Sequence, residues 1–333
     1  MGMVGVSSGT AAVLGLSQNR NDTLPTTAYL LLGESCRNSC SFCPRGAHND
    51  GGSSYLSRVT WPRFSWEEVF PRLIFACREG LLGRVCFQVT DAPGNHNQLL
   101  AYGKSLAGEG VAVNTSCVIH SEKEGRELLD AGFIRIALAL DAASPDIFAR
   151  VKGDRWQKTW ELLSRLNADY PGQVGTHLIA GLGEHPQEMF TVLFKLIREK
   201  IGVGLFAFTP VRGTPLAGYS PPPLNYYRQV QLASQLFQSG EIELQNLSFQ
   251  ANKLRDWGLS PLELAQAIRP QHFQTSGCLH CNRPYYNERP GGTIYNYPRP
   301  LTPAEFVQAT REALIGTEQE GVLDEKQILA AYY

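Results

Sequence analysis

Three of the eight cysteines lie within eight residues, as Cys36-x3-Cys40-x2-Cys43 in the stretch GESCRNSCSFCPRGAH. Thiols this close together favour a shared metal ion or cluster. A tetrahedral structural zinc site needs four protein ligands. The trio therefore either takes a fourth ligand from elsewhere, for which His48 is the local choice, or leaves one position open.

Composition and charge limit what the protein can be. The 333 residues are 43% hydrophobic and 18% charged, which is typical of a globular chain of one large domain or two ordinary ones. The net charge of −1 gives no general attraction for nucleic acid. No apolar run has transmembrane length, and the N-terminus lacks the basic segment that begins a signal peptide. We therefore expect a cytoplasmic protein without nucleic-acid or membrane partners, whose clustered cysteines indicate metal binding or catalysis.

Short apolar runs alternate with segments of helical spacing. The runs lie at 28–35, 84–91, 111–119, 134–141, 174–184 and 203–210. Several are almost continuously hydrophobic, as parallel strands covered on both faces are. Six strand–helix repeats predict a parallel α/β sheet, either open or curled into a barrel.

Three regions follow from this pattern. Residues 1–25 are glycine-rich and are expected to form a loosely ordered N-terminal arm, and 26–240 form the main domain. The remainder, 241–333, is a C-terminal extension with a predicted strand at 241–250 and a helix whose capping box is Ser260 and Glu263. The aromatic stretch 275–300 is too rich in tyrosine for a linker and is expected to cover the main domain.

The cysteine trio comes directly after the first predicted strand. In parallel barrels, strand ends and the loops after them build the active site. Three thiolates can hold three irons of a [4Fe–4S] cluster and leave the fourth iron open. The trio, with Phe42 before its last cysteine, resembles the radical S-adenosylmethionine superfamily.

This resemblance implies a partial (β/α)6 TIM-type barrel and a cluster whose open iron binds S-adenosylmethionine. An electron from the reduced cluster, supplied by a donor such as ferredoxin or flavodoxin, cleaves that cofactor. The resulting 5′-deoxyadenosyl radical removes a hydrogen atom from the substrate, while the protein binds, orients and shields the cofactor.

The stretch LIAGLGE (178–184) resembles the glycine-rich motif of the superfamily, with Ile179, Gly181 and Glu184 as expected cofactor-binding positions. Glycine there lets the backbone approach the adenosyl group. His177 replaces the usual leading glycine, which is a departure from the pattern. An ordinary strand-to-helix turn is the alternative reading of these glycines.

Polar residues at two other predicted strand ends complete the expected cofactor site. Asp141 is placed to accept hydrogen bonds from ribose hydroxyls, unless it caps the following helix. The second run ends in VTDAPGN, where the usual Gly-Gly-Glu of the superfamily is absent. Thr90 and Asp91 are the candidates there for the amino group of S-adenosylmethionine, and Asp91 suits an ammonium best.

The string GTPLA after the sixth run resembles biotin synthase and its relatives, and Arg212 beside it is a candidate for a substrate or cofactor carboxylate. Biotin synthase holds a second, sulfur-donating cluster on strand cysteines and an arginine. Here Cys86 and Cys117 lie in the second and third predicted strands, but the fifth has no cysteine. The pair Cys278-x2-Cys281 can complete a second iron–sulfur site, with a zinc knuckle, a redox pair and inert thiols as alternatives.

The favoured function is radical-mediated sulfur insertion at an unactivated carbon, with Cys278 and Cys281 catalytic through a sacrificial second cluster. The chain resembles one component of the two-protein lipoyl synthases, which implies an octanoylated carrier domain as substrate and a second radical S-adenosylmethionine protein as partner. The three-cysteine motif of ordinary lipoyl synthase is absent from residues 1–35. The alternatives are insertion into dethiobiotin, radical rearrangement or fragmentation of a small amino acid, as in hydrogenase maturase or methylornithine synthase, and a non-enzymatic iron–sulfur scaffold.

Overall fold

An eight-stranded sheet forms the centre of the protein, in the order β10-β9-β8-β7-β6-β2-β1-β5. The computed structural model describes residues 2–18, 22–50, 55–288 and 291–332. Six neighbouring strands run parallel: β2 (Ala28–Leu32), β6 (Val85–Val89), β7 (Val113–Ser116), β8 (Phe133–Ala137), β9 (Val174–Ala180) and β10 (Gly202–Ala207). Each coincides with one of the six predicted runs, which confirms the parallel α/β fold.

The sheet is curled, because side chains from all six parallel strands line one internal cavity. It is not closed, since β10 stands at one end of the order of described strands. The fold is therefore a partial (β/α)6 barrel, as expected.

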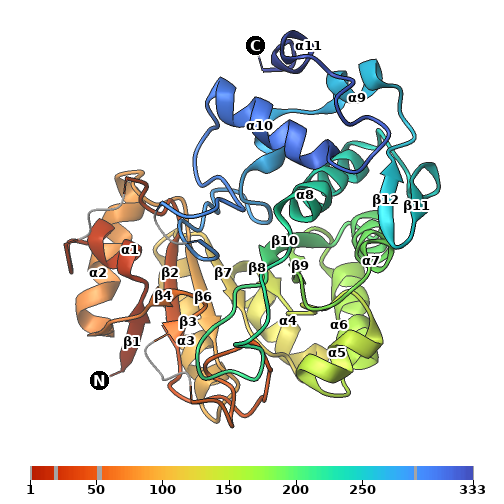
Figure 1. Cartoon of the computed structure of the whole chain (residues 1–333). Coiled ribbons are helices and arrows are strands. Elements are labelled where there is room, and N and C mark those ends of the chain that lie inside the picture. The colour runs from red at the N-terminus through yellow and green to blue at the C-terminus, as the bar shows by residue number, and fades with distance from the viewer. Residues whose placement is uncertain (1, 19–21, 51–54, 289–290, 333) are drawn as a thin grey trace.

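Helices cover the outer side of the sheet and link its strands (Figure 1). They are α2 (Trp66–Arg78), α3 (Asn95–Gly108), α4 (Glu122–Asp130), α5 (Pro145–Lys152), α6 (Trp156–Asp169), α7 (Pro186–Arg198) and, after the last strand, α8 (Leu224–Ser239). Side chains alternate between the two faces of a strand. Leu30 and Phe87 point outward and are fully buried in the main core, whereas Tyr29 and Cys86 beside them line the cavity.

The first residues are ordered, contrary to the expectation of a loose arm over 1–25. Strand β1 (Met3–Val6) pairs antiparallel with β2 and with β5 (Arg63–Ser65), and α1 (Ser8–Val13) follows. Val4 and Val6 are fully buried. The otherwise unpaired edge of β2 offers backbone hydrogen-bonding groups, so this short apolar segment gains ladder bonds and burial together. Residues 1 and 19–21 of the arm lie outside the described part of the chain.

A short hairpin stands beside this edge of the sheet. Its strands are β3 (Tyr55–Leu56) and β4 (Val59–Thr60), and Ser57 in its turn has a positive φ of 54°. The Ser57 hydroxyl donates to the backbone oxygen of Tyr286 at 2.5 Å. The hairpin is thus fastened to the C-terminal extension.

The extension packs against α7 and α8. Its elements are η1 (Leu244–Asn246), β11 (Ser248–Gln250), β12 (Lys253–Asp256), α9 (Pro261–Ala267), η2 (Pro270–Phe273), α10 (Pro303–Leu314) and α11 (Glu325–Leu329). The capping box of Ser260 and Glu263 is present at the start of α9, as predicted. The predicted strand at 241–250 is shorter than expected, because its first half forms the turn η1.

Residues 276–288, here called the CxxC segment, run along the side that the sheet leaves open. On the β10 side, Leu205 N donates to Ser276 Oγ (2.9 Å) and Asn287 Nδ2 donates to Ala207 O (2.8 Å). On the β2 side, Thr27 Oγ1 donates to His280 O at 2.7 Å. The segment therefore bridges the first and last parallel strands and encloses the barrel interior.

Across the described part of the chain, none of the helices has the length and apolar character needed to span a bilayer.

Candidate active site

The cysteine loop lies at the carboxyl end of β2, where the parallel strands end. Cys36, Cys40 and Cys43 all line one cavity, here called the upper cavity, of about 210 Å³. Asn49 fixes the loop by donating from Nδ2 to the backbone oxygens of Cys40 (3.0 Å) and Cys43 (2.7 Å). The buried Arg45 guanidinium fastens its start through Gly33 O and Glu34 O. The three thiols of this loop thus line the same cavity.

These thiols fit an iron–sulfur cluster better than zinc. Burial raises the pKa of Cys40 to about 12 and also raises the pKa of Cys43, so their thiolates need a bound cation. Among the described residues no three His, Cys, Asp or Glu side chains are placed to share one metal ion, and His48 is exposed. A [4Fe–4S] cluster instead takes one thiolate per iron and tolerates wider spacing.

Asp91 and Thr90 line the upper cavity, at the end of β6. The Asp91 carboxylate already contacts Arg37 Nη2 at 2.7 Å and His120 Nε2 at 3.1 Å. Burial raises the pKa of Asp91, but the hydrogen bonds from Arg37 and His120 outweigh it and leave the pKa below its usual value. Asp91 therefore links the cysteine loop to the loops after β6 and β7. An ammonium group bound by the Asp91 carboxylate would share it with Arg37 and His120.

Asp141 stands between the upper cavity and the barrel interior and lines both. Its backbone has a positive φ of 60°, and its carboxylate forms a 2.7 Å ion pair with Lys152 of α5. Ser144 begins α5, so the alternative that Asp141 caps this helix is wrong. A left-handed backbone at a buried acidic residue between two cavities supports a ligand-binding role for Asp141.

Of the remaining residues expected to bind the cofactor, some line a cavity and others do not. Phe42 lines both cavities and Ile179 lines the barrel interior. Glu184 lines neither, since its Oε1 accepts from Gly181 N and from Tyr226 OH, both at 2.7 Å. It holds the turn after β9, where Gly181 has a φ of 102° and a Cβ would lie 2.9 Å from Pro222. Arg212 is exposed and also lies outside both cavities.

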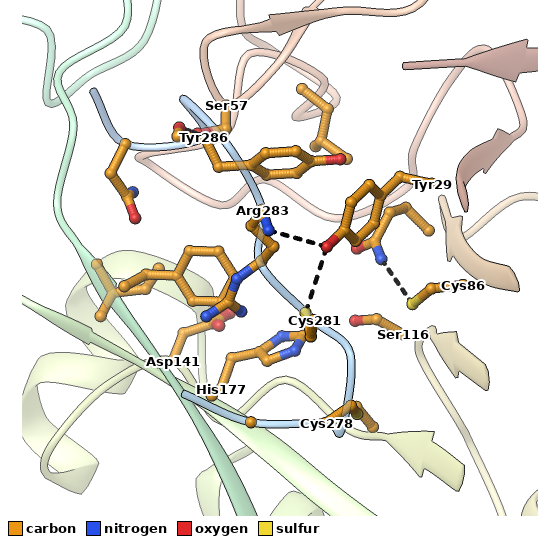
Figure 2. Close-up of a pocket in the computed structure, with 18 of the residues that line it drawn as sticks. Tyr29, Ser57, Cys86, Ser116, Asp141, His177, Cys278, Cys281, Arg283 and Tyr286 are labelled. Carbon is orange, nitrogen blue, oxygen red and sulfur yellow. Dashed lines mark hydrogen bonds between the residues drawn. The ribbon is translucent and has the colours of Figure 1, made fainter. Parts of the chain in front are cut away.

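The second cavity, here called the barrel cavity, lies inside the curled sheet and has a volume of about 210 Å³. Cys86, Cys278 and Cys281 all line it (Figure 2). The Cys281 sulfur lies 3.4 Å from the hydroxyl of Tyr29, which also accepts from Arg283 N at 3.0 Å. Burial and the nearby Cys278 and Cys281 raise the pKa of Cys86.

These three thiols meet because of strand register. Tyr29, Cys86, Asn114 and Arg135 occupy one rung across β2, β6, β7 and β8. All four point inward and line the barrel cavity. The Asn114 amide lies 3.2 Å and Arg135 Nη1 lies 3.8 Å from the Cys278 sulfur, so the CxxC segment docks against this rung.

Cys117 is not part of this group, which corrects the ligand set expected from the sequence. It lines the upper cavity and is 7% exposed. The reason is its place along the chain, because Asn114, Thr115 and Ser116 of β7 line the barrel cavity, whereas Cys117 follows the last residue of β7 and lies at the carboxyl end of the strands. Cys77 lies on α2, away from both cavities.

Several residues of this site were not anticipated from the sequence. Lys152, Tyr29 and Arg135 carry no motif, and only a correct assignment of the inward strand positions would have indicated the last two. His177, which the sequence showed only as a departure from the glycine-rich motif, lines the barrel cavity and packs against the Phe206 ring at a 5.2 Å centroid distance. Burial lowers the pKa of His177 to about 4, so this imidazole is neutral at physiological pH.

The comparisons agree with this geometry. The sequence pattern of the Radical SAM superfamily matches residues 30–197, about half of the chain. A crystal structure of methylornithine synthase is similar at 16% identity and a TM-score of 0.50, over 64% of this chain and 62% of that one. A crystal structure of HydG, a maturase of the [FeFe]-hydrogenase, is similar at 13% identity and a TM-score of 0.52, over 64% and 49%.

Comparison with curated proteins finds none that matches. The chain spans less than two thirds of the length of either solved structure, and at these identities the similarity concerns the fold alone. The family match covers the cysteine loop, Asp91, Asp141 and the turn held by Glu184. This chain belongs to the radical S-adenosylmethionine superfamily.

Proposed function

We propose that this protein inserts sulfur at an unactivated carbon of an apolar acyl chain, in the manner of the lipoyl synthases. The observation that carries the proposal is the position of Cys278 and Cys281, which enter the barrel beside Cys86 from the other end of the chain. Three thiols there supply ligands for a second iron–sulfur cluster. Cys117, which we expected among them, is left out because it faces the other cavity.

The upper cavity and the barrel cavity share part of their walls, which supports one reaction that uses both. Phe42, Cys43, Leu56, Gln88, Ser116 and Asp141 line both of them. A substrate held in the barrel cavity therefore lies between the cysteine loop above and the second thiol group below. This is the arrangement that hydrogen removal followed by sulfur transfer requires.

The barrel cavity has an apolar wall that suits an acyl chain. This wall is formed by apolar and aromatic side chains from the cysteine loop, the hairpin, β10 and the loop after it, and the CxxC segment: Phe42, Leu56, Phe206, Phe208, Val211 and Tyr286. Burial of methylene groups against such a wall contributes about 0.8 kcal/mol each. An octanoyl chain fits this chemistry better than a small charged amino acid.

When bound, the cofactors supply a radical that removes a hydrogen atom from the substrate carbon and a sulfide that forms the C–S bond as one electron passes to the second cluster. The chain itself contributes binding and shielding. Asp91 and Asp141 offer carboxylates in the upper cavity, and the CxxC segment closes the open side of the barrel against water.

Rearrangement of a small amino acid is the weaker candidate. It relied on Arg212 as the anchor for a substrate carboxylate, and the exposed Arg212 lies outside both cavities. Insertion into dethiobiotin stays a variant of the same proposal, because it uses the same two sites.

The test compares wild type with Cys278→Ala/Cys281→Ala after anaerobic reconstitution. With reductant, S-adenosylmethionine and an octanoylated carrier domain, wild type should form 5′-deoxyadenosine and a thiolated product seen by mass spectrometry. The double variant should keep cofactor cleavage and lose the product, with about four of about eight irons lost per chain. Cys77→Ala is the matched control, since Cys77 is also a half-buried thiol.

Assays with different substrates distinguish the candidate functions. Octanoylated carrier domain, dethiobiotin and free amino acids are supplied in turn, with and without a second radical S-adenosylmethionine protein as partner. The sulfur-insertion proposal fails if only free amino acids stimulate 5′-deoxyadenosine formation. It also fails if the double variant keeps full iron content and full activity.

A further inference from the structure

Three arginines gather around the lower thiols of the barrel cavity. Arg84, Arg135 and Arg283 all line it, together with Cys86, Cys278 and Cys281. Within the described ranges, none of the three guanidinium groups forms an ion pair with a carboxylate. Their positive charges therefore lack the compensation that buried arginines ordinarily have.

Arg283 is buried, with 9% of its surface exposed. Its Nη2 donates to the backbone oxygens of Leu205 (3.3 Å) and Ser276 (2.9 Å), and its guanidinium carbon lies 4.0 Å from the centre of the Phe206 ring. All these partners are neutral. Glu288 is the acidic residue of the CxxC segment, and its carboxylate accepts hydrogen bonds from the backbone N–H groups of Asn287, Tyr295 and Asn296.

Arg135 and Arg84 lie on the other side of the thiols. Arg135 Nη1 is 3.8 Å from the Cys278 sulfur, and its Nη2 donates to Gly172 O at 3.0 Å. Arg84 is 7% exposed, and its buried Nε has no hydrogen-bond partner. The Asn114 amide finds hydrogen-bond partners for both its oxygen and its nitrogen in one of its two orientations. In that orientation Arg84 Nη1 donates to the Asn114 side-chain oxygen at 2.8 Å.

The strands leave room for these side chains. A Cβ on Gly202 would lie 2.7 Å from Arg135 Nη1, and one on Gly204 would lie 3.2 Å from Arg283 Nη1. Two inward-facing positions of β10, Gly202 and Gly204, thus lack a side chain where the guanidinium groups of Arg135 and Arg283 lie. The arginines are therefore accommodated by the fold, and their charge calls for an anion in the same cavity.

We propose that Arg84, Arg135 and Arg283 compensate the negative charge of an iron–sulfur cluster held by Cys86, Cys278 and Cys281, and so raise its reduction potential. The inference rests on the second cluster of the proposed function. A cluster gains negative charge when it accepts an electron, so nearby cations favour the reduced form, strongly so in a poorly solvated cavity. The arginines thus affect the reaction only through the charge balance of the cluster and do not contact the reacting carbon.

The experiment isolates the second site in the full chain by the substitutions Cys36→Ala, Cys40→Ala and Cys43→Ala. Iron and sulfide content are measured, and the potential of the remaining cluster is determined by redox titration with electron paramagnetic resonance. Arg283→Gln and Arg135→Gln are each added to this background. Each is expected to shift the reduction equilibrium at least tenfold toward the oxidised form, which is about 59 mV for one electron.

Two controls distinguish charge from shape. Arg283→Lys keeps the charge and is expected to keep most of the potential, with an unchanged spectrum. Arg198→Gln removes a surface arginine that is 68% exposed on α7 and should change neither iron content nor potential. If circular dichroism shows that Arg283→Gln does not fold, the potential of Arg135→Gln tests the inference instead, because Arg135 is only half-buried.

The outcomes separate the two proposals. A triple cysteine variant that binds no iron overturns the second cluster and with it the proposed function. A cluster that forms but keeps its potential in both glutamine variants overturns the arginine inference alone. The same two glutamine substitutions are also made in the chain with its loop cysteines intact. The inference is overturned if they change only the KM of an acidic substrate there, because the arginines would then serve a substrate carboxylate.

Discussion

The Tyr29 hydroxyl lies 3.4 Å from the Cys281 sulfur, although the two residues are 252 positions apart in the chain. The same hydroxyl accepts the backbone N–H of Arg283 at 3.0 Å. The Tyr286 ring packs on that of Tyr29 with centroids 5.1 Å apart. One side chain of the first parallel strand thus holds the CxxC segment inside the barrel.

Replacing Tyr29 with phenylalanine should loosen this attachment. The change leaves the buried Arg283 N–H without its acceptor, which costs about 1–3 kcal/mol. We expect that loss in the free energy of unfolding measured in urea, together with a lower iron content at the second site. Tyr219→Phe is the control, because Tyr219 is 59% exposed. Unchanged stability and iron content in Tyr29→Phe would show that the hydroxyl does not anchor the segment.

Each cysteine of the loop should be needed for cofactor cleavage. Alanine at Cys36, Cys40 or Cys43 removes one of three thiolates and leaves the cluster without a full ligand set. We expect formation of 5′-deoxyadenosine, followed by liquid chromatography, to fall by at least a hundredfold in each variant. Cys77→Ala should retain wild-type rates, since Cys77 lies on α2 outside both cavities. A loop variant that still cleaves the cofactor would contradict this assignment.

The buried pair of Asp141 and Lys152 should contribute strongly to stability when one partner is removed. Their side chains are 10% and 11% exposed and lie 2.7 Å apart. Lys152→Met leaves the Asp141 carboxylate buried and uncompensated, which costs about 3–5 kcal/mol. The double variant Asp141→Asn/Lys152→Met should cost less than Lys152→Met alone, by urea unfolding. Additive effects of the two changes would rule out the coupling, and Lys123→Met, 85% exposed, is the surface control.

Glu305 should make the extension sensitive to acid. Hydrogen bonds from Arg299, at 2.8 Å, lower the pKa of Glu305 from 4.5 to about 2, and its carboxylate also closes the capping box of α10. Because the pKa is lower in the folded than in the unfolded chain, this stabilisation is complete above about pH 4.5 and is lost as the pH falls toward 2.

The measurement is the pH dependence of thermal unfolding between pH 2 and 6. Glu305→Gln should unfold at a lower temperature near pH 6 and show a flatter dependence below about pH 4.5. Glu325→Gln, with a side chain that is 64% exposed, should follow the wild-type curve. Parallel curves for Glu305→Gln and wild type would mean that the pair with Arg299 is not formed in solution.

Much of the fold could be predicted because it depends on local pattern. The six parallel strands were recognisable from nearly continuous apolar runs separated by helical periodicity, and Ser260 with Glu263 marked the start of α9. Strand β1 was missed because its glycine and its short length hide the pattern, and it becomes stable only by pairing with the edge of β2. Local propensity carries no information about that partner.

By itself, the sequence determined the cysteine loop and its chemistry, since Cys36, Cys40 and Cys43 are neighbours in the chain and follow a strand end. Only the tertiary structure decided which distant thiols meet. Cys86 and Cys117 both fell within predicted strands. The strand register places Cys86 beside Cys278 and Cys281, whereas Cys117 comes just after β7 ends and lines the upper cavity at the carboxyl ends of the strands. Register across six strands is set by packing of the whole barrel, which spacing along the chain does not record.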